Sequence, residues 1–274
     1  MQVLPILLTA AATVCSSAWA SSGAQFRVFD NTAYVNTTIG YGTTNINWIP
    51  NYVCHPLVQG GVLPAAEAWK SAVREWNIYP GYPLVLDCED LYFKNASTAD
   101  LNLHILSALQ TWADEVVSPG QIIGWYGLSG NTLPTLYDHY RSLIANHSAH
   151  AFFPSAYTFT SNLSSWNSSL NSVVQTIKTI DDSLPIWPYT WPQYHNNYTF
   201  LPVDLWKSEL QLLQARRDID GFVIWGGKNH AVCNDTCQAT AGQQPWLNAT
   251  RTYLATLYGL YTGQAERSGA QVFS

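Results

Sequence analysis

The feature that most constrains the fold of this chain is a repeated alternation between short apolar runs and longer segments with helical periodicity. Seven runs are typical of strands, at residues 26–29, 44–49, 84–86, 122–126, 151–153, 184–189 and 221–225. Six segments are typical of helices, at residues 65–76, 101–116, 133–144, 166–177, 203–215 and 246–257. Such alternation predicts an α/β fold with a parallel sheet covered by helices, either open or closed into a barrel.

Of these two arrangements, a TIM-like (β/α) barrel is favoured over an open nucleotide-binding sheet. No Gly-x-Gly-x-x-Gly motif follows the first strand candidate and no P-loop occurs, so a dinucleotide or nucleoside triphosphate has no support. We predict no cofactor and no metal site. The barrel is expected to be a single domain over residues 21–262, with its functional residues at the carboxyl ends of the strands.

The two ends of the chain are expected to lie outside this domain. Residues 3–14 are mostly apolar but too short to span a bilayer, and Ala18-Trp19-Ala20 has the small-x-small pattern that signal peptidase cleaves. We therefore predict a signal peptide over residues 1–20. Residues 263–274 lack the hydrophobic tail of a lipid-anchor signal and are predicted to form a flexible tail. The mature protein is thus expected to be secreted, soluble and monomeric, with no membrane partner.

Glycosylation acceptors independently indicate secretion. Eight Asn-x-Ser/Thr triplets without proline begin at Asn36, Asn95, Asn146, Asn162, Asn167, Asn197, Asn234 and Asn248. Single triplets occur by chance, but eight in a chain of 274 residues argue for passage through a glycosylating secretory pathway.

Cysteine usage fits the same oxidising compartment. After removal of the signal peptide four cysteines remain, and they permit three pairings. The short Cys233-x-x-x-Cys237 spacing favours a local disulfide, which leaves Cys54 with Cys88. A zinc site that uses His230 with Cys233 and Cys237 is the alternative, but no fourth ligand lies at a usual spacing.

Composition points away from nucleic acid and towards a flat, partly apolar ligand. Lys and Arg number 12 against 18 Asp and Glu, a net charge of -6, and no window clusters the cations that a phosphate backbone would need. The chain contains 12 Trp and 16 Tyr. Most of these are expected to pack the core, but aromatic faces left open in a groove stack on flat ligand surfaces.

Polar and aromatic side chains close the strand candidates, namely Asp87, Glu89, Tyr126, Tyr157, Tyr189 and Trp225. Because the carboxyl ends of parallel strands meet at one mouth of a barrel, we expect these side chains to ring that mouth. Asp87 and Glu89 are two residues apart in an extended segment, so both carboxyl groups face the same side while Cys88 points towards the helices.

Such a carboxyl pair can divide the work of acid–base catalysis. Mutual repulsion and partial burial raise the pKa of one group, which can act as a general acid near neutral pH while the other group stays anionic. A capping or loop-ordering role is the alternative for the pair. Tyr126 and Trp225 are also open to a second interpretation, as packing residues of the barrel core.

Five segments, collinear along the chain, resemble landmarks of the hyaluronidase family of glycoside hydrolases. Residues 26–31 (Phe-Arg-Val-Phe-Asp-Asn) resemble its first strand, and residues 60–64 (Gly-Gly-Val-Leu-Pro) resemble its Gly-Gly-Ile-Pro-Gln segment. Residues 86–89 (Leu-Asp-Cys-Glu) resemble its signature Asp-Trp-Glu. Residues 153–157 (Phe-Pro-Ser-Ala-Tyr) and 221–226 (Gly-Phe-Val-Ile-Trp-Gly) resemble its Phe-Pro-x-Cys-Tyr and Gly-Val-Val-x-Trp-Gly strand ends.

The resemblance implies a distorted seven-stranded barrel that hydrolyses a β-linked polymer containing N-acetylhexosamine. Glu89 would protonate the glycosidic oxygen and then activate water, and Asp87 would hold and polarise the substrate's acetamido group. The acetamide oxygen would be the nucleophile, an exception to the usual two-carboxylate rule. Tyr157 and Tyr189 would donate hydrogen bonds around the acetamide, and Trp225 would lie beneath its methyl group.

Two departures from the family pattern leave the polymer open. Residues 91–93 (Leu-Tyr-Phe) stand where the family has Trp-Arg-Pro, and Cys88 replaces the Trp of the signature. Hyaluronan is a polyanion and favours a basic groove, whereas this chain is acidic, with Lys94 and Lys228 the cations nearest the mouth. A neutral N-acetylated polymer such as chitin, or a deacetylated or galactosamine-based one, is therefore an alternative to hyaluronan.

Three other functions are alternatives to this one. A secreted barrel that binds sugar without cleaving it would need no carboxyl pair. A serine hydrolase is suggested by Ser129, but Asn131 stands where the nucleophile motif requires its second glycine. A direct retaining glycosidase would need a second carboxylate across the sugar; Asp30 is its remaining supplier, since Asp220 precedes its strand.

Overall fold

Parallel strands form the centre of the molecule in the computed structural model of the protein, which describes residues 26–145, 150–227 and 233–259. The strands are β1 (Arg27–Thr32), β2 (Thr44–Asn45), β3 (Asn47–Ile49), β4 (Leu84–Leu86), β5 (Ile123–Trp125), β6 (Tyr189–Thr190) and β7 (Gly221–Gly226). They make two parallel sheets, in the orders β2-β1-β7-β6 and β3-β4-β5.

Further parallel pairing closes the two sheets into one barrel. Residues 44–49 belong to both sheets, because β2 pairs with β1 and β3 pairs with β4. On the other side, isolated bridges join β5 to residues 150–153, and residues 152–155 to residues 186–189. With β7 paired to β1, the ring is complete. The predicted α/β barrel with seven strand segments is therefore confirmed.

The barrel is less regular than the sequence predicts at its fifth and sixth segments. Residues 151–153 make only isolated bridges, and the expected strand over 184–189 is regular only from Tyr189. Pro154, Pro185 and Pro188 interrupt this region, and a proline cannot donate a ladder hydrogen bond. Proline therefore accounts for the distortion.

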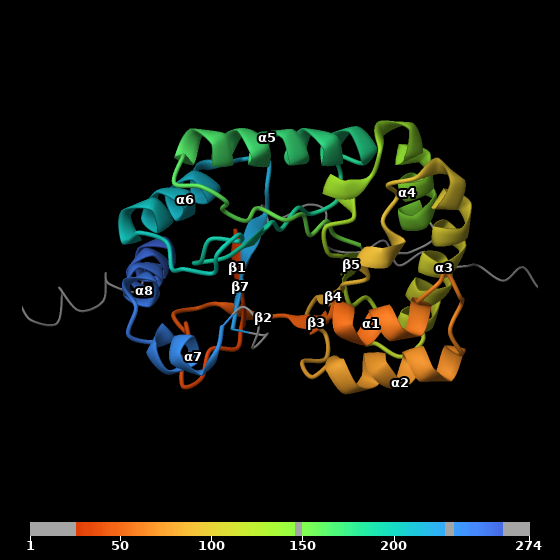
Figure 1. Cartoon of the computed structure of the whole chain (residues 1–274), viewed down its shortest axis with the longest axis horizontal. Helices are drawn as coiled ribbons and strands as arrows, with labels where there is room; N and C mark the ends of the chain where they lie inside the picture. Colours follow the sequence, from red (N-terminus) through yellow and green to blue (C-terminus); the bar gives the residue numbers. More distant parts are fainter. Residues whose placement is uncertain (1–25, 146–149, 228–232, 260–274) are drawn as a thin grey trace, which may run out of the picture.

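Helices surround the strands, as Figure 1 shows. They are α1 (Asn51–Val58), α2 (Ala66–Trp76), α3 (Ala96–Asp114), α4 (Tyr137–Ala145), α5 (Leu163–Ile180), α6 (Val203–Ala215), α7 (Asp235–Ala241) and α8 (Pro245–Leu257), with the 3-10 turns η1 (Glu89–Leu91), η2 (Ser129–Asn131) and η3 (Pro134–Leu136). Sequence periodicity does not predict α1 and α7, because α1 contains Pro56 and α7 has only seven residues.

Two apolar layers explain how the strands position the site. Inside the barrel, Phe29, Val85, Phe153 and Val223 pack together, whereas Leu86 and similar side chains pack outward against the helices. Successive residues of a strand point to opposite faces. A residue two positions after Val85 therefore also faces the interior, at the carboxyl end of β4.

Both disulfides favoured by the cysteine spacing are present. Cys54 of α1 is bonded to Cys88 just after β4, with their Cα atoms 5.4 Å apart, and Cys233 is bonded to Cys237. The first bond ties α1 to the segment that carries the carboxyl pair. The zinc interpretation is wrong, because the thiols of Cys233 and Cys237 are joined to each other; His230 lies outside the described residues.

The glycosylation triplets lie mostly on the surface. Asn36, Asn95, Asn162, Asn197, Asn234 and Asn248 are exposed, Asn167 is half-buried, and Asn146 lies outside the described residues. Three of the exposed ones also cap helices, since the side chains of Asn95, Asn162 and Asn234 accept backbone N–H bonds at the starts of α3, α5 and α7. A glycan would be attached through the amide nitrogen, which leaves the capping oxygen free.

The predicted signal peptide over residues 1–20 and the predicted tail over 263–274 lie outside the described residues. Among the helices of the described segments, none has both the length and the apolar character needed to cross a membrane.

Candidate active site

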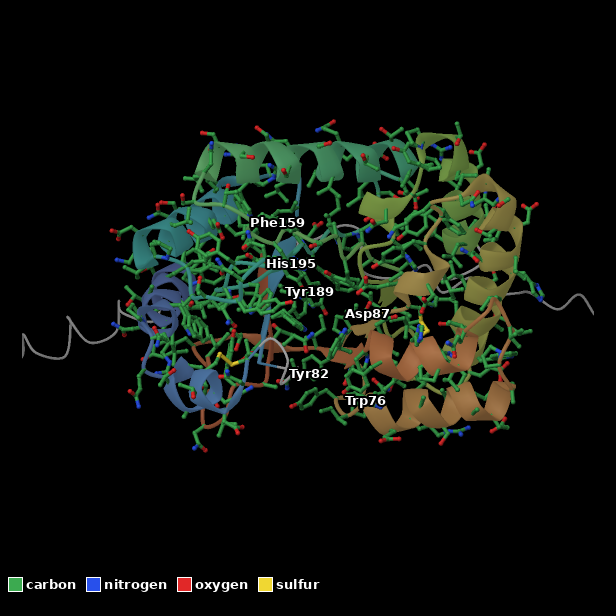
Figure 2. The ribbon with its side chains drawn as sticks, in the orientation of Figure 1. Trp76, Tyr82, Asp87, Phe159, Tyr189 and His195 are labelled. Carbon is green, nitrogen blue, oxygen red and sulfur yellow. A yellow bond between two sulfur atoms is a disulfide. The ribbon has the colours of Figure 1, made fainter. Side chains whose placement is uncertain are left out.

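A cavity of about 150 Å³ opens at the carboxyl ends of the strands. Its walls are made by Trp48, Asp87, Glu89, Tyr126, Tyr157, Tyr189, Trp191, His195, Tyr198 and Trp225. All six residues that the sequence places at strand ends are among them. Two carboxyl groups and a ring of aromatic side chains from five different strand segments therefore meet in one place, around the positions of Asp87 and Tyr189 in Figure 2.

Asp87 lies deep in this cavity. It follows β4, its backbone N–H donates to Ile49 O at 3.0 Å, and its side chain is only 6% exposed. Burial, and next the charge of Glu89, raises the pKa of Asp87 to about 8, against smaller opposing hydrogen bonds from Asn51 and Trp48. The Oδ1 atom has no hydrogen-bond partner. A buried acceptor without a partner favours a ligand that donates a hydrogen bond to it.

Glu89 lies nearer the opening of the cavity, at the start of η1. Its backbone N–H donates to Asn51 Oδ1 at 3.0 Å, which connects η1 to the start of α1. Partial burial raises the pKa of the Glu89 carboxyl; Lys94 opposes this shift, and Asp90 adds to it. Asp90 itself turns to α1, where its Oδ2 lies 2.7 Å from His55 Nδ1. Glu89 is thus the carboxyl group of the cavity that an incoming ligand reaches first.

Three tyrosines line the cavity together with the carboxyl groups. The ring centroid of Tyr126 lies 5.2 Å from that of Tyr189 and 6.2 Å from that of Tyr157, and the hydroxyls of Tyr126 and Tyr157 are hydrogen-bonded. Burial raises the pKa of all three hydroxyls. They therefore stay protonated at neutral pH and can act as hydrogen-bond donors.

Tryptophans form the floor of the cavity. Trp225, at the end of β7, packs edge to face against Trp191, with ring centroids 4.8 Å apart, and also contacts Trp48 at 6.3 Å. The Trp191 Nε1–H is shared between Tyr34 Oη at 3.1 Å and Gln193 Oε1 at 3.0 Å. These bonds hold the Trp191 ring in place, and Trp225 packs against it.

Sequence reasoning missed four wall residues: Trp48, Trp191, His195 and Tyr198. Two of them had a usable signal, because Trp48 is two residues after the inward-facing Ile46, and Trp191 is two residues after Tyr189. His195 and Tyr198 come from the loop after β6, where no periodicity indicates which way a side chain points.

The structure excludes Asp30 and Ser129, the two alternative nucleophiles. Asp30 turns away from the cavity, and its Oδ1 accepts hydrogen bonds from the backbone N–H and the hydroxyl of Thr32 at 2.9 and 2.7 Å. Asp220 precedes β7, as expected, and accepts from the Ile186 N–H at 2.9 Å. Ser129 is fully buried in η2, lies outside the cavity wall, and its Oγ has no partner that would act as a base. The serine-hydrolase interpretation is therefore wrong.

Comparison with known proteins identifies the fold. No protein-family model and no curated protein sequence matches the chain. Among solved structures it is similar to bee venom hyaluronidase, with a TM-score of 0.62 at 15% identity over 84% of this chain and 99% of that one. The same enzyme in complex with a hyaluronic acid tetramer gives a TM-score of 0.58 at 14% identity, over 82% and 98% of the two chains.

The chain has the fold of a hyaluronidase. The resemblance inferred from five collinear landmarks is therefore confirmed at the level of the fold. A weaker similarity, with a TM-score of 0.44 at 13% identity over 84% and 89% of the chains, is to a GH128 (subgroup VII) oligosaccharide-binding protein from Trichoderma gamsii.

Proposed function

We propose that this protein is a secreted glycoside hydrolase that cleaves a β-linked polysaccharide containing N-acetylhexosamine. The observation that carries the proposal is the pair Asp87 and Glu89 in one aromatic-lined cavity at the carboxyl end of a barrel with the hyaluronidase fold. Aromatic floors suit the apolar faces of sugar rings, and a carboxyl pair suits glycosidic bond cleavage. Bee venom hyaluronidase binds a hyaluronic acid tetramer, which supports a polysaccharide as the ligand here.

Substrate assistance is the mechanism that fits the placement of the carboxyl groups. A direct retaining glycosidase needs a second carboxylate across the sugar, about 5–5.5 Å from the acid. In the described part of the chain, Asp87 and Glu89 are the only carboxyl groups in the cavity wall, and they are two residues apart on one side. The nucleophile is therefore proposed to be the substrate's own acetamide oxygen.

Asp87 is proposed to hold that acetamide. Its Oδ1, which has no hydrogen-bond partner, is a suitable acceptor for the acetamide N–H. A hydrogen bond donated to this oxygen favours the carboxylate form of Asp87. Binding would thus lower the pKa of Asp87 from about 8. The new negative charge would raise the pKa of Glu89 in turn, so the single proton of the pair would be held by Glu89 when the substrate is in place.

Glu89 is proposed to act first as acid and then as base. It donates its proton to the glycosidic oxygen while the acetamide oxygen attacks the anomeric carbon, so the glycosidic bond breaks and a cyclic intermediate forms. Water then attacks the same carbon, the bond between this carbon and the acetamide oxygen breaks, and the water gives a proton back to Glu89. Tyr189 donates a hydrogen bond to the acetamide group, and Tyr157 donates a second one in place of the bond that it donates to Tyr126 in the free protein.

The charge of the cavity bears on the choice of polymer. Among the described wall residues two are acidic and none is Lys or Arg, and partial burial lowers the pKa of His195, which favours its neutral form. Lys94 lies over the Tyr92 ring, 4.7 Å from its centroid, and Lys228 lies outside the described residues. A polyanion such as hyaluronan favours a basic groove. This wall therefore supports an uncharged polymer such as chitin as an alternative to hyaluronan.

We also infer that the protein is secreted and glycosylated. The two disulfides support an oxidising compartment, and the six exposed glycosylation triplets are accessible for modification.

The test is hydrolysis of a panel of polymers. The secreted protein is incubated with hyaluronan, chondroitin, chitin oligomers and galactosaminogalactan, and new reducing ends are measured. Cleavage of one of them by the native protein, with a loss of roughly 10²–10⁴-fold in Glu89→Gln, supports the proposal because an amide cannot donate the required proton. Asp138→Asn is the matched control, since Asp138 lies on α4 outside the cavity wall and pairs with Arg141. Binding without cleavage of any polymer would favour a non-catalytic sugar-binding barrel.

A further inference from the structure

A continuous row of aromatic rings leads out of the cavity across α1 and α2. It begins at the cavity floor, where Trp225 contacts Trp48, and continues from Trp48 to Tyr52 and from Tyr52 to Trp76. The ring centroids are 6.3, 6.5 and 5.9 Å apart in these three steps. In Figure 2, Trp76 lies below Asp87. Trp48, Tyr52 and Trp76 are called the aromatic row below.

The outer members of the row are open to solvent. Tyr52 is 58% exposed and Trp76 is half-buried. Trp69, on the same helix as Trp76, shows what a packing tryptophan looks like here: it is 0% exposed, and its Nε1–H donates to Leu109 O at 2.8 Å. The core does not need the ring of Tyr52, and connected apolar surface left in water is typical of a binding site.

The geometry of the row leaves ring faces available. Each ring meets the next edge to face, with interplanar angles of 77°, 86° and 74° along the row. An edge-to-face contact covers one face of a ring at most, and Tyr52, which makes two such contacts, is still 58% exposed, so part of its ring can stack on a ligand. The ligand that such rings suit is a sugar, which has a flat apolar face and needs no charge to bind.

We propose that the aromatic row is an extended binding surface for the polysaccharide chain, holding sugar units that lie beyond the cavity. This inference rests on the proposed function, because it takes the polymer in the cavity as its starting point. The direct contact of Trp48 with Trp225 makes the row continuous with the floor of the cavity. A chain long enough to pass from Glu89 to α2 would therefore bind more tightly than one that fills the cavity alone.

The experiment compares chain lengths in binding measurements. Chitin and hyaluronan oligomers, from disaccharides to octasaccharides, are titrated calorimetrically into the native protein and into Glu89→Gln, which prevents turnover. Tyr52→Ala and Trp76→Leu remove the two outer rings, and leucine keeps the apolar packing at position 76. Tyr41→Asn is the matched control, because Tyr41 is 44% exposed, does not line the cavity and has a φ of 55° that asparagine tolerates.

Affinity should rise with chain length in the native protein and in Tyr41→Asn. Each outer-ring variant should lose roughly 2- to 12-fold in affinity for the long oligomers, the range of one aromatic contact, and nothing for the disaccharide. If the affinity still rises with chain length as in the native protein in both outer-ring variants, and both unfold at the native temperature, the proposal that the aromatic row binds sugar is wrong. The native protein could instead cleave no polymer but bind long oligomers more tightly, with this gain lost in the two variants. That result would support the aromatic row as a binding surface and contradict the proposed hydrolase activity.

Discussion

Asn31 Nδ2 donates a hydrogen bond of 3.1 Å to the hydroxyl oxygen of Tyr189. The two residues come from β1 and β6, which are separated by β7 in the barrel, and both are buried. Because the Tyr189 oxygen accepts this bond, its own proton is directed elsewhere, and Tyr189 lines the cavity. Asn31 therefore orients Tyr189 as a hydrogen-bond donor towards a ligand.

The first prediction concerns that donor. Tyr189→Phe should lower kcat/KM on a cleaved polymer by about 10-fold, the size expected for one hydrogen bond to the reacting group. The same variant should lose about 1–3 kcal/mol of unfolding free energy, because it leaves the buried Asn31 amide without its acceptor. Steady-state kinetics and urea denaturation measure the two effects.

A double variant separates the two effects. Asn31→Ala combined with Tyr189→Phe removes the Asn31 amide that Tyr189→Phe leaves without an acceptor. The double variant should therefore recover part of the lost unfolding free energy, while its kcat/KM should remain as low as that of Tyr189→Phe. Recovery of the rate together with the stability would mean that Tyr189 acts only through packing.

The second prediction is the pH dependence of hydrolysis. The carboxyl pair must hold one proton to supply the general acid, and the pKa of Asp87 in the free protein is raised to about 8. As the pH rises through this value the pair loses its last proton, so kcat/KM should fall about tenfold per further pH unit. Initial rates at constant ionic strength, from about pH 4 to about pH 10, test this expectation. A rate that stays level from neutral pH to the alkaline end would contradict it.

Much of the site could be located from the sequence, because the residues that follow predicted parallel strands meet at one end of the barrel. Asp87, Tyr126 and Trp225 each end an apolar run, and in a parallel barrel such ends converge whatever the strand lengths. The alternation rule also placed Cys88 on the helix side, where it bonds to Cys54. These inferences need only local periodicity and the direction of the chain.

Other parts of the site depend on tertiary contacts that periodicity does not encode. His195 stacks on Tyr157, with centroids 5.4 Å apart, but it comes from a loop without repeat. The outward turn of Asp30 follows from its bonds to Thr32, and α1 forms although it contains Pro56. The aromatic row likewise joins residues of β3, α1 and α2 that no sequence pattern connects.

The third prediction is that the burial of Asp87 in the cavity lowers the free energy of unfolding. Its pKa is about 8 in the folded protein against 3.8 ordinarily, so between these values the folded state holds a proton that the unfolded chain has released. Stability from this group therefore falls as the pH rises through that window. Asp87→Asn should raise the unfolding free energy at pH 8 by on the order of a few kcal/mol, and should have little effect below the lower pKa.

Glu209 provides the matched control for this measurement. It is fully buried on α6, its Oε1 accepts from Thr158 Oγ1 at 2.7 Å, and burial raises the pKa of its carboxyl to about 8. Glu209→Gln should stabilise the protein over the same pH range while hydrolysis continues, because Glu209 lies outside the cavity wall. Thermal unfolding of both variants from acidic to alkaline pH distinguishes them, since only Asp87→Asn should also lose activity.

The last prediction concerns the acetamide as nucleophile. If the acetamide oxygen attacks, the intermediate is a positively charged five-membered ring, and a thiazoline that mimics it should inhibit more strongly than substrate binds. Asp87→Asn removes the anion beside that ring, so it should weaken inhibition by roughly 10- to 150-fold, the range of a hydrogen bond to a charged group. Glu89→Gln should still bind the thiazoline in a direct binding measurement, because Glu89 acts on the leaving oxygen. Full activity on a polymer without N-acetyl groups, together with indifference to the thiazoline, would exclude substrate assistance.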